Sequence, residues 1–135
     1  MQLEIQQPQP AYTDDRGVIT DVLVKVPMEH VTLITSCRGS VRGNHYHQDT
    51  TQWVYVIEGR LQLLAQKPGQ PVQVVEVERG ALVTHGPMES HTMVALEDSV
   101  FMVFTRGPRG GADYESDTFR LAEPLEVIAG KERGP

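Results

Sequence analysis

The chain has 135 residues, enough for one domain with a single sizeable hydrophobic core. Hydrophobic residues make up 39% and charged residues 22%, the balance of a soluble globular protein, and no apolar run approaches the ~18 residues that a membrane span needs. The net charge of −6 disfavours nucleic-acid binding, which depends on many Lys and Arg contacts to phosphate, but leaves room for a small anionic ligand.

Short β-rich runs, separated by Gly, Pro and Asp at intervals of roughly 8–12 residues, predict an all-β sandwich or barrel. The expected strands cover residues 17–25, 31–36, 41–47, 52–58, 60–66, 72–78, 81–84, 91–96 and 100–106. Tight hairpin turns are expected at Glu58-Gly59 and at 67–70. The segment LAEPLEV predicts either a late strand or a short helix. We expect one domain over 1–135, with a barrel core at about 17–106 and a C-terminal extension over 107–135.

The N-terminal sequence MQLEIQQPQP has neither the basic nor the apolar region of a signal peptide. The single cysteine, Cys37, cannot form an internal disulfide, and we expect it to be a small buried hydrophobe. Both observations favour a cytoplasmic, reducing compartment.

Two strands carry an unusual amount of apolar surface. In QWVYVIE, Gln52, Val54 and Val56 share one face, and the other face carries Trp53, Tyr55 and Ile57. The run Val100 to Phe104 is apolar on both faces, although a strand with one face in solvent should alternate. The outer face is therefore covered by the chain's own termini or by a second copy. We favour a homodimer that buries Trp53, Tyr55, Ile57, Phe101 and Val103.

Histidines form the most informative pattern. His45 and His47 are two apart on an expected strand, so both imidazoles project from one face. Gln52 opens the next strand, and His91 begins a much later strand, after a turn that contains proline. In a closed barrel these four side chains can converge on one interior point. His30 and His85 lack such partners and are expected on the surface or in loops.

The spacing of these residues resembles a known superfamily. Gly39, His45, His47, Gln52 and Gly59 reproduce the first cupin motif, G-x5-H-x-H-x4-E-x6-G, with Gln52 in place of Glu. The second, looser motif is matched by Gly80, Pro87 and His91. The resemblance implies a single-domain cupin, an all-β jelly-roll barrel that is also called a double-stranded β-helix.

A longer stretch is similar to the dTDP-sugar 3,4-ketoisomerases, which stand with the dTDP-sugar 3,5-epimerases among the RmlC-like cupins. It comprises Asp15-Arg16-Gly17, the run VPME at 26–29, the run RGNHYH at 42–47, Gln52, and Ala112-Asp113-Tyr114 with Asp117. Cupin domains attached to sugar-nucleotide dehydrogenases of polysaccharide pathways share the RGNHYH-like core. The resemblance implies a small-molecule isomerase or epimerase that acts on a nucleotide-linked keto sugar.

In that reading no cofactor is needed. An imidazole can accept and donate a proton near neutral pH, and the resemblance implies His45 as the base and His47 as the acid or its relay. Gln52 and His91 would contact the substrate, while Arg42 and Arg16 would hold its diphosphate. Strict alternation places Arg42 on the face opposite His45, so this role requires a β-bulge, for which Gly43 is the expected site.

Two alternatives stay open. His45, His47 and His91, with the Gln52 amide, could bind one divalent transition metal (Fe, Ni, Zn, Cu or Mn) for oxygenase, cyclase or isomerase chemistry. The neutral amide weakens this alternative, because no carboxylate offsets the charge of the ion. The third hypothesis is a non-catalytic cupin that binds a sugar or metabolite, since the strand VTLITS has Thr and Ser where the ketoisomerases supply Arg and Tyr.

Overall fold

The computed structural model describes residues 3–108 and 115–132, so Ala112-Asp113-Tyr114 lies outside the described residues. The strands are β1 (Glu4–Gln6), β2 (Pro10–Asp14), β3 (Gly17–Thr20), β4 (His30–Ser36), β5 (Val41–Tyr46), β6 (Thr51–Glu58), β7 (Arg60–Gln66), β8 (Gln73–Glu78), β9 (Leu82–His85), β10 (Ser90–Ala95), β11 (Ser99–Arg106) and β12 (Phe119–Arg120). The late segment forms a helix, α1 (Leu125–Glu132). Each predicted strand is present, although the first ends at Thr20; β1, β2 and β12 were not predicted.

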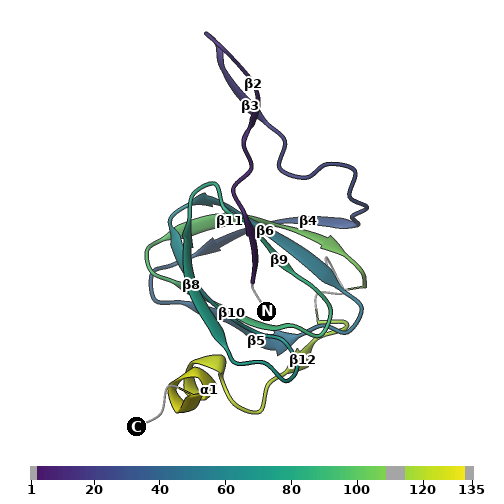
Figure 1. Cartoon of the computed structure of the whole chain (residues 1–135), viewed down its shortest axis with the longest axis vertical. Coiled ribbons are helices and arrows are strands. Elements are labelled where there is room, and N and C mark those ends of the chain that lie inside the picture. The colour runs from purple at the N-terminus through teal and green to yellow at the C-terminus, as the bar shows by residue number, and fades with distance from the viewer. Residues whose placement is uncertain (1–2, 109–114, 133–135) are drawn as a thin grey trace.

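Two antiparallel sheets face each other and enclose the core, as Figure 1 shows. One has the strand order β1-β9-β6-β11-β4 and the other β12-β5-β10-β7-β8. Inward-facing aliphatic and aromatic side chains from both sheets form the core: Val54, Val56, Leu61, Leu63, Val77, Ala81, Val83, Ala95, Phe101 and Val103. The prediction of a mostly β, jelly-roll domain is confirmed.

The pairing of β6 with β11 determines which face of each strand points into the core. Alternation along β6 buries Gln52, Val54 and Val56, as predicted. On β11, however, Phe101 is 0% exposed and Val103 is 5% exposed, so both point into the core. The prediction that Phe101 and Val103 lie in a dimer interface was wrong. Both faces of this strand are apolar, and only its pairing with β6 determines which one is internal.

The turn at Glu58-Gly59 is a corner between sheets and not a hairpin. β6 pairs with β9 and β11, whereas β7 pairs with β8 and β10, so the chain changes sheet at Gly59. Gly59 has φ of 92°, and a Cβ there would lie 2.6 Å from the carbonyl oxygen of Asp98. The turn at 67–70 is the predicted hairpin, since β7 pairs with β8 and the Gln70 amide donates to the Lys67 carbonyl.

The terminal segments extend the barrel. The hairpin of β2 and β3 projects away from it (Figure 1), and β3 pairs only with β2 among the described strands. β12 lies along β5, and α1 packs through Leu125 and Ala129 against Leu64. Cys37 is exposed in the turn after β4, so the expectation of a buried cysteine was wrong. Within the described residues, no helix is long and apolar enough to span a membrane.

Candidate functional site

A cavity of about 540 Å³ lies inside the barrel, within the size range of small-molecule sites. Residues from both sheets line it: Thr32, Ile34, Val41, Arg42, Gly43, His45, Gln52, Val54, His85, His91, Met93, Val103 and Thr105, together with Glu115 and Arg120. The polar part of this lining comes from both sheets and includes Arg42, His45, Gln52, His85, His91 and Arg120.

Two cross-strand pairs position these polar side chains. In one sheet, His45 on β5 lies directly opposite His91 on β10. In the other sheet, Gln52 on β6 lies directly opposite His85 on β9. Directly opposed residues project from the same face of a sheet, so each pair enters the cavity together. Three of the four members were predicted, and His85 was not.

The histidines are close enough to act as one cluster. The His45 ring centroid lies 4.9 Å from that of His47 and 4.8 Å from that of His91, and the candidate ligand atoms of these three residues lie within 4.8 Å of one another. His47 is 1% exposed and does not line the cavity; it contacts the cavity through His45 and His91. His45, Gln52 and His91 line the cavity as expected, whereas His47, which was expected to face it as well, lies behind them in the wall, with its ring centroid 5.2 Å from that of His91.

Hydrogen bonds orient the rings of the cluster. His47 Nδ1 lies 2.9 Å from the carbonyl oxygen of Asp117, and His91 Nδ1 lies 3.2 Å from that of Glu89. A carbonyl oxygen can only accept, so both Nδ1 atoms donate, and in the neutral form of either ring the lone pair lies on Nε2. That arrangement suits either proton transfer or metal ligation at Nε2.

His85 and Glu89 form a buried pair beside the cluster that sequence reasoning missed. His85 Nδ1 lies 2.7 Å from Glu89 Oε1, and the side chains are 1% and 4% exposed. The His85 ring stacks on His91 with a centroid separation of 4.4 Å, and Lys67 Nζ lies 3.9 Å from the other Glu89 oxygen. His85 Nε2 is buried and has no hydrogen-bond partner among the described residues.

A local signal for His85 was present in the sequence. The predicted strand ended at Thr84, one residue too early, and extending its alternation from Ala81 through Val83 brings His85 onto the inner face. His30, in contrast, is partly exposed at the start of β4 and lies outside the cavity lining. The expectation of a surface or loop position was therefore wrong for His85.

The predicted β-bulge is present. His91 of β10 lies opposite His45 of β5, but the next residue, Thr92, lies opposite Gly43 and not Asn44. Gly43 and Asn44 therefore occupy the place of one residue opposite Thr92, which is the geometry of a β-bulge. Gly43 has φ of 113° and Asn44 has φ of 59°. Because of this extra residue, Arg42 and His45 both line the cavity, which strict alternation would forbid.

Arg42 is held in place by β4. Its Nε donates to Ser36 Oγ at 2.8 Å, and its Nη2 donates to the Thr35 carbonyl at 3.0 Å. Arg16 lies elsewhere: it forms an ion pair with Asp14 on the projecting hairpin, and its side chain is 82% exposed. Within a single chain, Arg16 is therefore not a cavity residue, whereas Arg120, which was not predicted, is.

Burial lowers the pKa of His91 well below its usual value, because the charged imidazolium loses its hydration in the core. Repulsion from His85, then from His45 and His47, lowers it further. His91 is therefore a neutral imidazole near pH 7, able to donate one hydrogen bond and accept another.

Comparison with known families decides the membership of the chain. The model of the polysaccharide biosynthesis C-terminal domain matches residues 12–107, which include the histidine cluster and the bulge. The chain belongs to this family. A search among curated proteins found no relative.

Solved structures show the same fold as this family member. The sugar 3,4-ketoisomerase QdtA from Thermoanaerobacterium thermosaccharolyticum, in complex with TDP, is 17% identical with a TM-score of 0.72, covering 98% of this chain and 97% of its own. A 3,4-ketoisomerase from Helicobacter canadensis is 14% identical with a TM-score of 0.74, covering 98% of both chains. The epimerase RmlC from Legionella pneumophila is 18% identical with a TM-score of 0.73, covering 94% of this chain and 76% of its own. The fold is therefore that of the RmlC-like cupins.

Proposed function

We propose that this family member is an isomerase or epimerase that acts on a nucleotide-linked keto sugar by histidine acid/base chemistry without a cofactor. The observation that carries the proposal is the cavity in which His45, His91 and Gln52 converge beside a fixed guanidinium, that of Arg42. The structural likeness to ketoisomerases and epimerases of this type supports the substrate class.

The proposed reaction moves a proton next to a carbonyl. His45, which lines the cavity, removes the proton alpha to the carbonyl, and the pair of electrons passes into an enediolate. Protonation of the former carbonyl carbon, with the proton of the alpha hydroxyl passing to the former carbonyl oxygen, moves the carbonyl. Protonation of the alpha carbon from its other face, by an acid other than His45, inverts that centre. His47 lies in the wall and acts as the relay rather than as a group in contact with substrate.

The remaining residues bind the substrate. Gln52 offers both a donor and an acceptor to a sugar hydroxyl. Neutral His91, whose Nδ1 donates to the Glu89 carbonyl, offers only the Nε2 lone pair as an acceptor from the opposite sheet. Arg42 would pair with the diphosphate. A role for Arg16 stays a prediction, because Arg16 does not line the cavity of its own chain and its hairpin projects away from the barrel (Figure 1).

The test uses TDP-4-keto-6-deoxyglucose, the ligand of a QdtA variant of similar fold. In D₂O, NMR should show exchange or migration of a proton next to the carbonyl with the unmodified protein. His45→Asn should lose about 10²–10⁴-fold of this rate, because proton transfer by a placed base is worth that much. His30→Asn is the matched control and should keep the rate. Equal rates in His45→Asn and the unmodified protein would remove His45 from the mechanism.

A metal-dependent cupin is the second candidate, and the close approach of His45, His47 and His91 is the observation that favours it. These imidazoles fit a divalent transition metal, and Gln52 could add its amide oxygen. A bound ion would supply Lewis-acid polarisation of a substrate carbonyl. If the cavity instead binds a sugar or metabolite without turnover, the NMR assay stays silent while ligand binding is retained.

The metal content of the unmodified protein separates the two enzymatic candidates, and Gln52→Glu tests how the neutral amide affects metal binding. Adding one negative charge beside three buried histidines should raise affinity for Zn²⁺ or Ni²⁺ by at least about tenfold. Gln70→Glu, in the exposed turn after β7, adds the same charge outside the cavity and should leave affinity unchanged. Elemental analysis measures the metal content of each protein as purified, and metal titration measures the affinity of each variant. Near-stoichiometric metal in the unmodified protein, surviving dialysis against a chelator, would make the metal-dependent cupin the better assignment.

A further inference from the structure

The charges in the cavity wall have the opposite balance to the chain as a whole. The protein has a net charge of −6, yet among the described residues the cavity is lined by two arginines, Arg42 and Arg120, and one carboxylate, Glu115. Lining of this composition favours an anionic ligand over a neutral or cationic one.

Arg120 is positioned by the strand that carries it. In β12 it lies directly opposite His45 on β5, so both side chains leave the same face of the sheet. Phe119 stacks on Tyr46 with a centroid separation of 5.3 Å, and the Leu121 amide donates to the Asn44 carbonyl at 2.9 Å. The short strand is therefore fixed on both sides of Arg120.

The Arg120 guanidinium is engaged by a nearby carboxylate. Its Nη2 donates to Glu115 Oε1, and the two side chains are 64% and 51% exposed. Ion pairs with this exposure contribute little to stability, so a better anion can displace the carboxylate at little cost. A phosphate group that accepts two hydrogen bonds from one guanidinium is such an anion.

We propose that Arg120 and Arg42 together bind the diphosphate of a nucleotide ligand, and that Glu115 is the resident counter-ion that the diphosphate replaces. The nature of the ligand rests on the proposed function. Arg42 is oriented by its hydrogen bonds to Ser36 and to the Thr35 carbonyl. Arg120 leaves Glu115 and pairs with the diphosphate when the ligand binds. Glu115 therefore competes with the diphosphate for Arg120 and lowers the affinity of the protein for the ligand.

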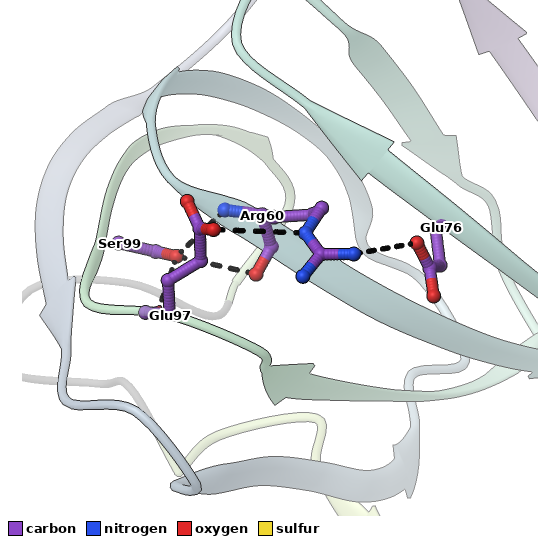
Figure 2. A network of polar contacts seen from close by, with 4 residues as sticks. All are labelled: Arg60, Glu76, Glu97 and Ser99. Atoms are coloured by element: carbon purple, nitrogen blue, oxygen red, sulfur yellow. Dashed lines mark hydrogen bonds and ion pairs between the residues drawn. The ribbon is translucent and has the colours of Figure 1, made fainter.

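Arg60 provides a matched control. Figure 2 shows its guanidinium between two carboxylates, 3.1 Å from Glu76 and 3.7 Å from Glu97. It is an exposed arginine in ion pairs of the same type, and it does not line the cavity. Substitutions at Arg60 and Glu76 therefore change the net charge as those at Arg120 and Glu115 do, without touching the proposed site.

The test is the dissociation constant of TDP and of inorganic pyrophosphate, measured by calorimetry on the full chain. Arg120→Gln should weaken TDP binding by roughly tenfold, whereas Arg60→Gln should stay within about twofold of the unmodified protein. Glu115→Gln should tighten binding by about two- to fivefold, whereas Glu76→Gln should not. Thermal unfolding of each variant shows that the fold is retained.

Three outcomes would overturn the inference. The first is that TDP binds Arg120→Gln as tightly as it binds the unmodified protein. The second is that Glu115→Gln and Glu76→Gln change the affinity equally. The third is that neither anion binds the unmodified protein at millimolar concentration. The first two leave the proposed function intact. Conversely, pyrophosphate binding that depends on Arg120, in a protein that does not act on the keto sugar, would support the inference and contradict the proposed function.

Discussion

The fold opposes protonation of His91, because the residue is 2% exposed and surrounded by other imidazoles. Its pKa in the native state lies well below the value of 6.5 that it has when unfolded. The native state therefore binds fewer protons than the unfolded state once the pH falls to that value. The stability contributed by neutral His91 is complete above about pH 6.5 and is lost as the pH falls below it.

We expect the free energy of unfolding to decrease between pH 7 and pH 5, with up to about 1.4 kcal/mol per pH unit arising from this group. His91→Asn should be less stable at pH 7 but should show a shallower decrease over the same interval. Urea unfolding at pH 7, 6 and 5 measures both slopes. If the slopes are equal, protonation of His91 does not govern acid sensitivity.

At the scale of elements, the bulge in β5 decides which side chains reach the cavity. A Cβ on Gly43 would lie 2.6 Å from the carbonyl oxygen of His91 and 3.0 Å from Thr92 Cα, both of them backbone atoms that cannot move aside. The bulge is further held by Asn44, whose Oδ1 accepts from Thr92 Oγ1 and from the first amide of α1. Asn44 therefore links the bulge, which brings Arg42 and His45 to the cavity, to the start of α1.

Gly43→Ala should therefore destabilise the protein by roughly 2–4 kcal/mol, the sum of a strained φ and a backbone clash, and should also impair ligand binding. Gly39→Ala is the control, because Gly39 has φ of 88° and nothing within 4 Å of its Cβ position. Gly39→Ala should lower the free energy of unfolding only by the cost of the strained φ, about 1 kcal/mol. Urea midpoints compare the two variants, and equal losses would show that the contact with β10 is unimportant.

At the scale of the molecule, an apolar patch covers the outer face of one sheet. On it, Val31 and Leu33 of β4 are 55% and 62% exposed. Pairing extends the patch across two further strands: Met102 lies beside Leu33 and Tyr55, and Phe104 lies beside Val31 and Trp53. A continuous apolar face of this kind is typical of an interaction surface. We keep the prediction of a homodimer, with this patch as its interface.

Light scattering should give about twice the monomer mass of 15.0 kDa at micromolar concentration. Leu33→Glu should shift the mass toward the monomer, because an exposed side chain can be charged without disturbing the core. Val74→Glu, at a 41% exposed position on β8 in the other sheet, should not. A monomer mass for the unmodified protein would contradict the prediction.

Much of the site follows from the sequence because its determinants are local. The two-residue period of a strand places His45 and His47 on one face, and the cupin spacing adds Gln52 and His91. The need for a bulge beside Arg42 follows from the same period, and the structure contains it.

The remaining features depend on contacts between residues far apart in the chain. Alternation could not tell the inner face of β11 from its outer face, since both are apolar, and only pairing with β6 did so. His85 becomes a cavity residue because β9 pairs with β6 opposite Gln52, and Arg120 because β12 pairs with β5 opposite His45. Local patterns determine which side chains share a face, whereas strand partners and register, which bring distant segments together, determine what that face encloses.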